Sequence, residues 1–424
     1  MSLPLTKEQI HSAIATMGQQ ARQAAYGLAA LSADQKNDIL SAMARELRAE
    51  TETIVAANAL DLHQAREKGL SSAMIDRLRL DASRVEAMAS GIDQVARLHD
   101  PCGEILSEVK RPNGMLIRQV RVPIGVIGII YESRPNVTSD AAILCLKSGN
   151  ATILRGGSEA IHSNRAIAVA LQKGGESAGL PANAIQLVPF TDRESVVALA
   201  QMDRYLDLII PRGGKGLIET VVSLARMPVI KHYDGICHTY IDSSANLEMA
   251  IRISVNAKTQ KPGVCNAMET LLVHEHVAHA FLPQLAFALR EKNVELRGCE
   301  RTREILTDII PASEEDWGTE YLDLILSMKV VNSTEDAIAH INHFGSHHSD
   351  CIITDDDNAA KYFLTHVDSA CVFHNVSTRL ADGEEFGFGA EIGISTDKIH
   401  ARGPMALREL TTYQYRITGD GVIK

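Results

Sequence analysis

Apolar residues in the first hundred positions recur at helical spacing. Ser32-Ala33-Asp34-Gln35 has the spacing of a capping box, in which the Ser hydroxyl and the Gln side chain each bond an otherwise unpaired backbone N–H. The apolar positions that follow share one helical face: Ile39, Leu40, Met43 and Leu47. Segments 71–78 and 83–98 also predict helices. We therefore expect the chain to begin with a helical part.

From about residue 122 the pattern changes to short β-branched runs that alternate with amphipathic segments. In a first region we predict strands at 124–131, 151–155, 185–188 and 206–210, and helices at 140–147, 159–176 and 193–200. In a second region we predict strands at 239–241, 270–274, 325–331, 350–353 and 371–373, and helices at 247–258, 277–292, 334–343 and 358–366. Strands separated by helices indicate βαβ units and parallel sheets. The predicted fold class is α/β, with two Rossmann-like lobes that meet near 231–235.

Two stretches fall outside both lobes. Residues 104–120 predict a hairpin that turns at Pro112-Asn113-Gly114, and residues 411–417 predict a separate strand. Peripheral strands need hydrogen-bond partners, so we expect them to form a sheet between subunits. This predicts a homo-oligomer, and the pattern leaves a dimer and a tetramer open.

Composition and charge exclude several classes of protein. With 45% hydrophobic and 22% charged residues, the chain is not expected to be disordered. Its net charge of −11 disfavours general binding to nucleic acid. No apolar run reaches the roughly 20 residues of a membrane span, and residues 1–8 do not resemble a secretory signal. The seven cysteines are scattered and lack a C-x-x-C pair, which favours a reducing cytoplasm over a disulfide framework.

One glycine-rich turn could bind an anion. Pro211-Arg212-Gly213-Gly214-Lys215-Gly216 follows a predicted strand and begins a predicted helix. Exposed N–H groups and the helix dipole at such a turn favour an anion. Since Gly216 stands where a P-loop has Ser or Thr, this is not a P-loop. A tight turn with solvated charges is the alternative interpretation.

Cys265 differs from the cysteines that lie within apolar strings. It follows Pro262-Gly263 in a loop, with Lys258 and Lys261 just upstream. A thiol near cations and helix-start N–H groups forms thiolate more readily, as a covalent nucleophile requires. An inert loop cysteine is the alternative from spacing alone. The histidines do not predict a metal site: His274-Glu275-His276 is not part of H-E-x-x-H, and His347-His348 lacks a convergent cysteine at zinc-like spacing.

Several long segments together resemble the gamma-glutamyl phosphate reductases, a family within the aldehyde dehydrogenase superfamily. The resemblance covers essentially the whole chain and is carried by 123–126, 134–136, 210–214, 261–270, 340–352 and 400–405. It implies an aldehyde dehydrogenase-like fold with a small oligomerisation element. The implied domains are a cofactor-binding domain (1–103 and 121–234), a catalytic domain (235–380) and oligomerisation strands (104–120 and 405–424). The superfamily also implies an active site in the cleft between the lobes.

The resemblance implies Cys265 as the nucleophile in the reduction of L-glutamyl 5-phosphate through a thioester. The Asn136 side chain and the Cys265 backbone N–H would hold the oxyanion; a turn residue after Pro135 is the alternative for Asn136. Hydrolytic relatives carry an E-L-G-G segment, whereas the matching stretch here, 231–235, has no Glu. A general base for water would waste the thioester, so its absence favours phosphate as the acyl partner. Lys261 and Arg134 are hypotheses for the group that receives the leaving phosphate.

The resemblance also implies a nicotinamide cofactor, and we expect NADP(H). Arg155 ends a strand, and Ser158 stands where NAD-preferring relatives place an acid that would repel a 2′-phosphate. Arg212, Gly213 and Gly214 are further candidate cofactor residues. Glu320 resembles the residue that holds the nicotinamide ribose, with a surface acid as the alternative.

The implied role is the second step of proline synthesis, and glutamate 5-kinase is a candidate partner because the acyl phosphate is labile. The rival hypotheses are a hydrolytic aldehyde dehydrogenase, a non-catalytic binding protein and a metal hydrolase.

Overall fold

The chain forms two compact units. The computed structural model describes residues 5–424, so the predictions for the first four residues lie outside it. The first unit runs to residue 231 and also contains 387–393 and 405–424. The second unit consists of 232–386 and 394–404. The chain therefore passes between the two units four times, after residues 231, 386, 393 and 404.

The first unit begins with the expected helices. They are α1 (Lys7–Ala29), α2 (Ala33–Ala49), α3 (Thr51–Glu67), α4 (Ser72–Leu78) and α5 (Ala82–Arg97). Ser32 and Gln35 form the predicted capping box at the start of α2. The predicted apolar face of α2 is buried, with Leu40, Met43 and Leu47 fully inaccessible to solvent.

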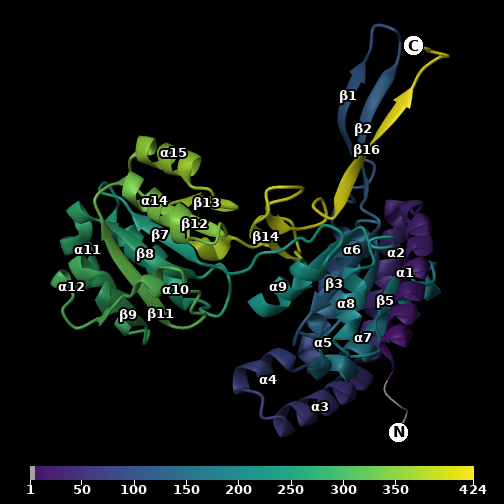
Figure 1. The fold of residues 1–424 in the computed structure, drawn as a ribbon, viewed down its shortest axis with the longest axis horizontal. Helices are drawn as coiled ribbons and strands as arrows, with labels where there is room; N and C mark the ends of the chain where they lie inside the picture. Colours follow the sequence, from purple (N-terminus) through teal and green to yellow (C-terminus); the bar gives the residue numbers. More distant parts are fainter. Residues whose placement is uncertain (1–4) are drawn as a thin grey trace. The chain divides into compact units, whose positions relative to one another are not determined.

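A four-stranded parallel sheet forms the centre of the first unit. Its strands are β3 (Val126–Tyr131), β4 (Ala151–Arg155), β5 (Ile185–Leu187) and β6 (Leu208–Arg212), in the order β5-β4-β3-β6. The helices of this region are α6 (Asn136–Lys147), the short η1 (Ser158–Ala160), α7 (Ile161–Ser177), α8 (Glu194–Ala200) and α9 (Lys215–Leu224) (Figure 1). Strands β4 and β5 follow β3 on one side of the sheet, whereas β6 lies on the other side of β3. The connections therefore switch direction between β3 and β6. Open parallel sheets bind ligands at such switch points.

The second unit is built on a seven-stranded sheet. Its strands are β7 (Cys237–Ile241), β8 (Met268–His274), β9 (Glu295–Gly298), β10 (Ile310–Pro311), β11 (Ile325–Val331), β12 (Ser349–Ile353) and β13 (Cys371–His374). They pair in parallel in the order β10-β9-β11-β8-β7-β12-β13.

The helices of the second unit are α10 (Leu247–Thr259), α11 (Glu275–Arg290), α12 (Glu300–Ile305), α13 (Glu314–Trp317), α14 (Thr334–Phe344), α15 (Asp357–His366) and the short η2 (Thr378–Leu380). The five predicted strands and four predicted helices of this region are confirmed with shifted ends. Strands β9 and β10 were not predicted. They have only four and two residues at the edge of the sheet, which is too short for a recognisable hydrophobic pattern.

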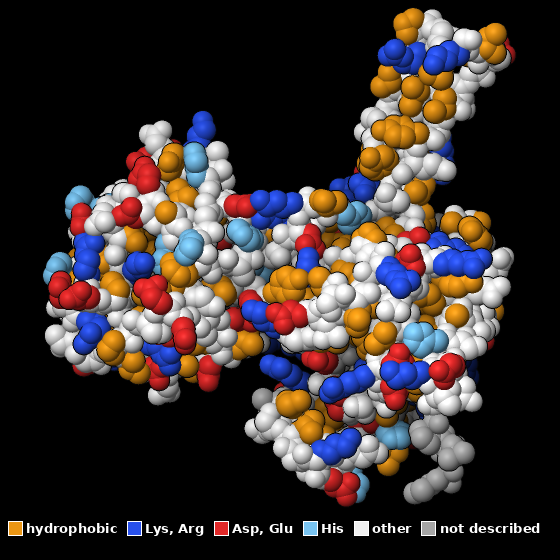
Figure 2. Space-filling model, in the orientation of Figure 1, with side chains coloured by type: hydrophobic (Ala, Val, Ile, Leu, Met, Phe, Trp, Pro, Cys, Tyr) orange, Lys and Arg blue, Asp and Glu red, His pale blue; other side chains and the backbone are white. Residues whose placement is uncertain are grey.

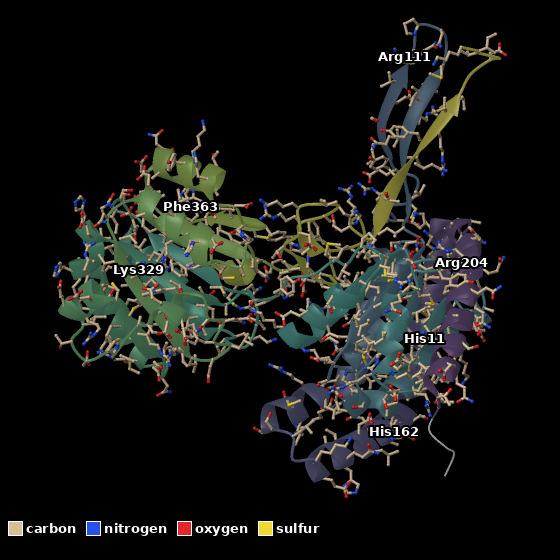
Figure 3. The ribbon with its side chains drawn as sticks, in the orientation of Figure 1. His11, Arg111, His162, Arg204, Lys329 and Phe363 are labelled. Carbon is tan, nitrogen blue, oxygen red and sulfur yellow. The ribbon has the colours of Figure 1, made fainter. Side chains whose placement is uncertain are left out.

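A separate three-stranded antiparallel sheet belongs to the first unit. It contains β1 (Ile105–Lys110), β2 (Leu116–Pro123) and β16 (Thr411–Thr418), in the order β1-β2-β16. It extends away from the four-stranded sheet, and Arg111, at the turn after β1, marks its far end (Figures 1 and 3). The predicted hairpin is confirmed. The strand predicted at 411–417 is confirmed, and it pairs with β2 along its whole length within the chain. The sheet between subunits stays a prediction.

This three-stranded sheet exposes apolar side chains along its length (Figure 2): Ile105, Leu106, Val109, Tyr413, Tyr415 and Ile417 are all at least 39% exposed. Two more strands, β14 (Gly393–Ser395) and β15 (Gly403–Met405), form a two-stranded sheet. Across residues 5–424, no helix combines the length and apolar composition that crossing a membrane would need.

Candidate active site around Cys265

Cys265 lies at the edge of the second sheet where its parallel strands begin. It belongs to the loop between α10 and β8, three residues before Met268 starts the strand. His348 stands directly before β12, and Gly235 stands two residues before β7. Because β8, β7 and β12 are neighbours and run in the same direction, the residues that precede them meet at one edge.

Asn266, next to Cys265, fixes the loop between α10 and β8 to a second segment. Its buried side-chain amide donates to the backbone oxygens of Arg379 (3.4 Å) and Ala381 (3.0 Å). The Arg379 guanidinium bonds the Asn266 side-chain oxygen in return and also donates to Gln260 Oε1 at 2.9 Å. The loop is therefore held on both sides of Cys265.

Gly235 packs directly against the backbone of Cys265. A Cβ added at Gly235 would overlap the carbonyl oxygen and Cα of Cys265, so a side chain would displace Cys265. The Gly235 N–H donates to Glu320 Oε1 at 2.9 Å. The Cys237 thiol donates to the carbonyl oxygen of Cys265 at 3.2 Å.

Two histidines converge on the Cys265 thiol. One nitrogen of His232, one nitrogen of His348 and the Cys265 sulfur all lie within 4.8 Å of one another. The prediction that no cysteine converges on His348 is wrong, because residues far apart in sequence meet at the strand edge. His232 was not predicted, although it occupies the position of the absent Glu in the 231–235 stretch.

The hydrogen bonds of these histidines leave a free nitrogen on each ring. His232 Nδ1 bonds the Ile394 carbonyl oxygen at 2.9 Å, so Nδ1 carries the hydrogen and Nε2 is left to accept a proton or bind a metal. His348 is fully buried, and its Nδ1 lies 2.9 Å from Ser349 Oγ. Its Nε2 has no hydrogen-bond partner among the described residues. Burial lowers the pKa of His348 to about 4, so the imidazole is neutral near pH 7.

This cluster can do two kinds of chemistry. A neutral imidazole with a free nitrogen can take the proton of a nearby thiol. One thiolate and two imidazoles are also ligands that suit Zn²⁺, with a fourth position left for water.

Of the two lysines expected to activate Cys265, one is neutralised inside the fold. Lys258 is fully buried and its Nζ lies 2.5 Å from Glu269 Oε2, also fully buried. Burial lowers the pKa of Lys258 and raises that of Glu269 to about 7. The expectation that Lys258 presents a free cation to Cys265 is therefore wrong. Lys261 is exposed.

Asn136 lies in the first unit, as the first residue of α6. Its side-chain amide donates to Asp140 Oδ2, one helical turn further on, at 2.8 Å. This bond orients the amide and leaves its second N–H for another acceptor. Burial raises the pKa of Asp140 to about 6. Asp140 carried no recognisable signal in the sequence.

The predicted cofactor residues of the first unit lie at the ends of β4 and β6. Arg155 is only 9% exposed, and its guanidinium donates to Ser195 Oγ and to the backbone oxygens of Gly156, Thr191 and Asp192. In this conformation Arg155 holds the loop before α8 rather than offering its charge outward. Ser158 is exposed.

The Arg212-Gly213-Gly214 turn lies at the switch point between β3 and β6. The Gly214 N–H donates to Glu132 Oε2 at 2.9 Å, so a carboxylate of the protein already bonds the start of α9. No atom lies within 4 Å of a Cβ built at Gly216, which leaves room beside this turn. The parallel sheet, its switch point and the open space beside Gly216 fit a dinucleotide cofactor. Arg134, between β3 and α6, is exposed.

Comparisons with known proteins agree on one family. The model of the aldehyde dehydrogenase family matches residues 4–302. Gamma-glutamyl phosphate reductase from Moorella thermoacetica is 57% identical over 97% of this chain and 98% of its own length. The crystal structure of gamma-glutamyl phosphate reductase from Thermotoga maritima is 45% identical, with a TM-score of 0.96, over 97% of this chain and 99% of its own.

A more distant structure shares the fold alone. It is an engineered glycolyl-CoA reductase with bound NADP⁺, 16% identical, with a TM-score of 0.67 over 96% of each chain.

Proposed function

The chain belongs to the aldehyde dehydrogenase family, among its gamma-glutamyl phosphate reductases, and on that premise we propose that it reduces L-glutamyl 5-phosphate to L-glutamate 5-semialdehyde with NADPH and releases phosphate. The family identifies an oxidoreductase that acts on an aldehyde. The observation that carries the finer assignment is the cluster of Cys265 with two histidines, which contains no carboxylate. A thiol without a carboxylate base for water suits transfer between acyl phosphate and thioester better than hydrolysis.

The two histidines prepare the nucleophile. We assign the Cys265 proton to an imidazole nitrogen of this pair, directly or through one water, because one nitrogen each of His232 and His348 lies within 4.8 Å of the sulfur. The thiolate then attacks the acyl phosphate carbonyl. A carbon–sulfur bond forms, the carbon–oxygen bond to phosphate breaks, and a thioester remains on Cys265. We assign the departing phosphate to Lys261 and Arg134, which are both exposed cationic residues.

Fixed N–H donors stabilise the oxyanion that forms during attack. The Cys265 backbone N–H is held in place because Asn266 is anchored on one side and Gly235 packs on the other. We assign the second donor to the Asn136 amide, which Asp140 orients. Such donors act on charge that develops only near the transition state.

Bound NADPH would supply the hydride that reduces the thioester carbonyl; cleavage of the carbon–sulfur bond then releases the aldehyde and returns Cys265 as the thiolate. We assign its binding to Ser158, Arg212, Gly213 and Gly214, with Glu320 at the nicotinamide ribose. The preference for NADP(H) rests on Ser158, because no acid stands there to repel a 2′-phosphate. The buried Arg155 gives this preference no direct support. The ratio of kcat/KM for NADPH and NADH tests it, and a strong NADH preference would refute the assignment.

The product carries an amine and an aldehyde, which condense spontaneously to pyrroline-5-carboxylate. We therefore place the enzyme at the second step of proline synthesis, in the cytoplasm, after a glutamate 5-kinase that supplies the labile acyl phosphate. We propose that it works as a homo-oligomer.

The reverse reaction tests the function. NADPH formation from glutamate 5-semialdehyde and NADP⁺ is measured with and without inorganic phosphate, in the wild type, Cys265→Ala and the control Cys299→Ala. We expect phosphate-dependent turnover that Cys265→Ala abolishes and Cys299→Ala retains. Turnover without phosphate would indicate a hydrolytic enzyme, and no turnover by folded protein would refute the proposal.

A further inference from the structure

A cavity of about 390 Å³ opens beside Asn136 in the first unit. One wall comes from residues 77–88, at the end of α4 and the start of α5, and the other from Asn136 and Asp140 on α6. Leu80, Ala87 and Met88 give the cavity an apolar part. It can therefore take a short carbon chain that carries charged groups at one end.

Three arginines line this cavity, but they differ in what they bind. Arg84 donates to the backbone oxygens of Asp76 (2.6 Å) and Arg79 (2.7 Å) and pairs with the Asp76 carboxylate at 3.0 Å, so it holds the end of α4. Arg77 and Arg79 are exposed and have no ion pair or side-chain hydrogen bond within the described part of the chain. Two cationic groups are thus available to a ligand anion.

Asp140 supplies an anion on the opposite wall. Its Oδ2 accepts the Asn136 amide N–H, and no hydrogen bond from the described residues engages Oδ1. One cavity therefore carries unneutralised positive charge on one wall and a carboxylate on the other. A ligand with adjacent anionic and cationic groups matches this arrangement better than a simple anion does.

We propose that this cavity binds the α-amino-acid end of the substrate, with Arg77 and Arg79 on the α-carboxylate and Asp140 on the α-ammonium group. The inference rests on the function proposed above. Asn136 and Asp140 lie four residues apart on α6, about 6 Å along the axis, and their side chains meet in a 2.8 Å hydrogen bond. A substrate with only two methylene groups between its amino-acid carbon and its reacting carbonyl, which Asn136 is assigned to hold, can therefore reach both side chains. Arg77, Arg79 and Asp140 are thus specificity-determining residues.

Three aldehydes that differ in one group each test the assignment. Glutamate 5-semialdehyde carries both groups, 5-oxopentanoate lacks the amine, and 4-aminobutanal lacks the carboxylate. The variants are Arg77→Ala, Arg79→Ala and Asp140→Asn, with Arg111→Ala, at the distant hairpin turn, as the control. Asp140→Asn keeps an oxygen that can accept the Asn136 amide.

The measured quantity is the ratio of kcat/KM between aldehydes. A charge-assisted hydrogen bond corresponds to roughly 10–100-fold in binding. We expect the arginine variants to lose about that factor of preference for the semialdehyde over 4-aminobutanal. Asp140→Asn should lose its preference over 5-oxopentanoate, and Arg111→Ala should keep both ratios.

Two outcomes would overturn the inference. If kcat/KM falls equally for all three aldehydes, or if the ratios do not change, these residues do not bind the amino-acid end of the substrate. A raised KM for inorganic phosphate with unchanged aldehyde ratios would assign the arginines to the phosphate instead. The two proposals are tested by different measurements. Phosphate-dependent turnover by the wild type tests the proposed function, whereas the kcat/KM ratios of the variants test the assignment of this cavity.

Discussion

The buried pair of Lys258 and Glu269 gives a sharp prediction for the stability of the second unit. Both side chains are fully inaccessible, with 2.5 Å between Nζ and Oε2. The other carboxylate oxygen, Oε1, accepts the Leu322 N–H at 3.2 Å. Lys258→Met leaves that carboxylate buried without its cation. Removing one partner of such a pair costs about 3–5 kcal/mol.

Neutralising the second partner should recover much of this loss. In Lys258→Met/Glu269→Gln no buried charge remains, and the Gln oxygen can still accept the Leu322 N–H. We expect the double variant to be more stable than Lys258→Met. The cost of the single variant should also shrink as the pH falls from 8 to 6. Its unpaired carboxyl binds a proton more tightly when folded than when unfolded, so stability rises as the pH falls.

Trp317 makes the measurement selective. It is the only tryptophan, is 3% exposed and belongs to the second unit, so its fluorescence follows the unfolding of that unit. With a urea dependence of roughly 2 kcal/mol per molar, the single variant should unfold at about 1.5–2.5 M less urea than the wild type.

A midpoint shift below about 0.5 M for the single variant would refute the assignment of a buried, mutually dependent pair. The rate at which iodoacetamide alkylates Cys265 gives the functional control. The alkylation rate should be the same in the double variant and the wild type, because the charge of Lys258 is paired with Glu269 and does not act on the Cys265 thiol. A large decrease would restore Lys258 as the group that activates the thiol.

Four further predictions concern the site and the surface. Gly235→Ala should lower kcat by about 10²–10³-fold, because its Cβ displaces the Cys265 backbone donor, whereas the control Gly318→Ala has nothing within 4 Å of its Cβ. The pKa of His348 is about 4 in the folded state and near 6.5 in the unfolded state. The neutral buried ring therefore contributes about 3 kcal/mol to the free energy of unfolding above pH 6.5, and this contribution is lost as the pH falls toward 4. His348→Gln should flatten that part of the pH–stability curve. Micromolar Zn²⁺ should inhibit reversibly through Cys265, His232 and His348, and His348→Ala should weaken this inhibition more than His347→Ala does. Tyr415→Arg with Val109→Lys should yield smaller assemblies in sedimentation, because both side chains are exposed on the three-stranded sheet; an unchanged assembly would exclude this surface as the interface.

The sequence allowed the parts of this structure that depend on local pattern to be predicted. The capping box of α2, the strand at Ile325–Val331 and the hairpin around residues 112–114 follow from spacing and turn chemistry. Spacing left Cys265 open between a nucleophile and an inert loop cysteine, and the family resemblance singled it out as the predicted nucleophile.

What could not be predicted depends on which segments meet in space. His348 reaches Cys265 only because β12 and β8 both flank β7, and strand order is not written in any one segment. The direction in which a side chain points could not be predicted either. From the sequence, the charges of Lys258 and Arg155 were expected to face solvent or a ligand, but both side chains point into the protein. A useful signal was the shared position of Cys265 and His348 shortly before predicted strands.

The pairing of β16 with β2 has a consequence for synthesis on the ribosome. The β2 strand emerges early, but its partner β16 follows roughly 300 residues later. At the usual rates of elongation, the edge of β2 waits roughly 15–60 s for its partner. During that interval an unpaired strand edge can join another nascent chain. The first unit is therefore vulnerable to aggregation until β16 has been made, and a chain truncated before residue 411 would stay vulnerable.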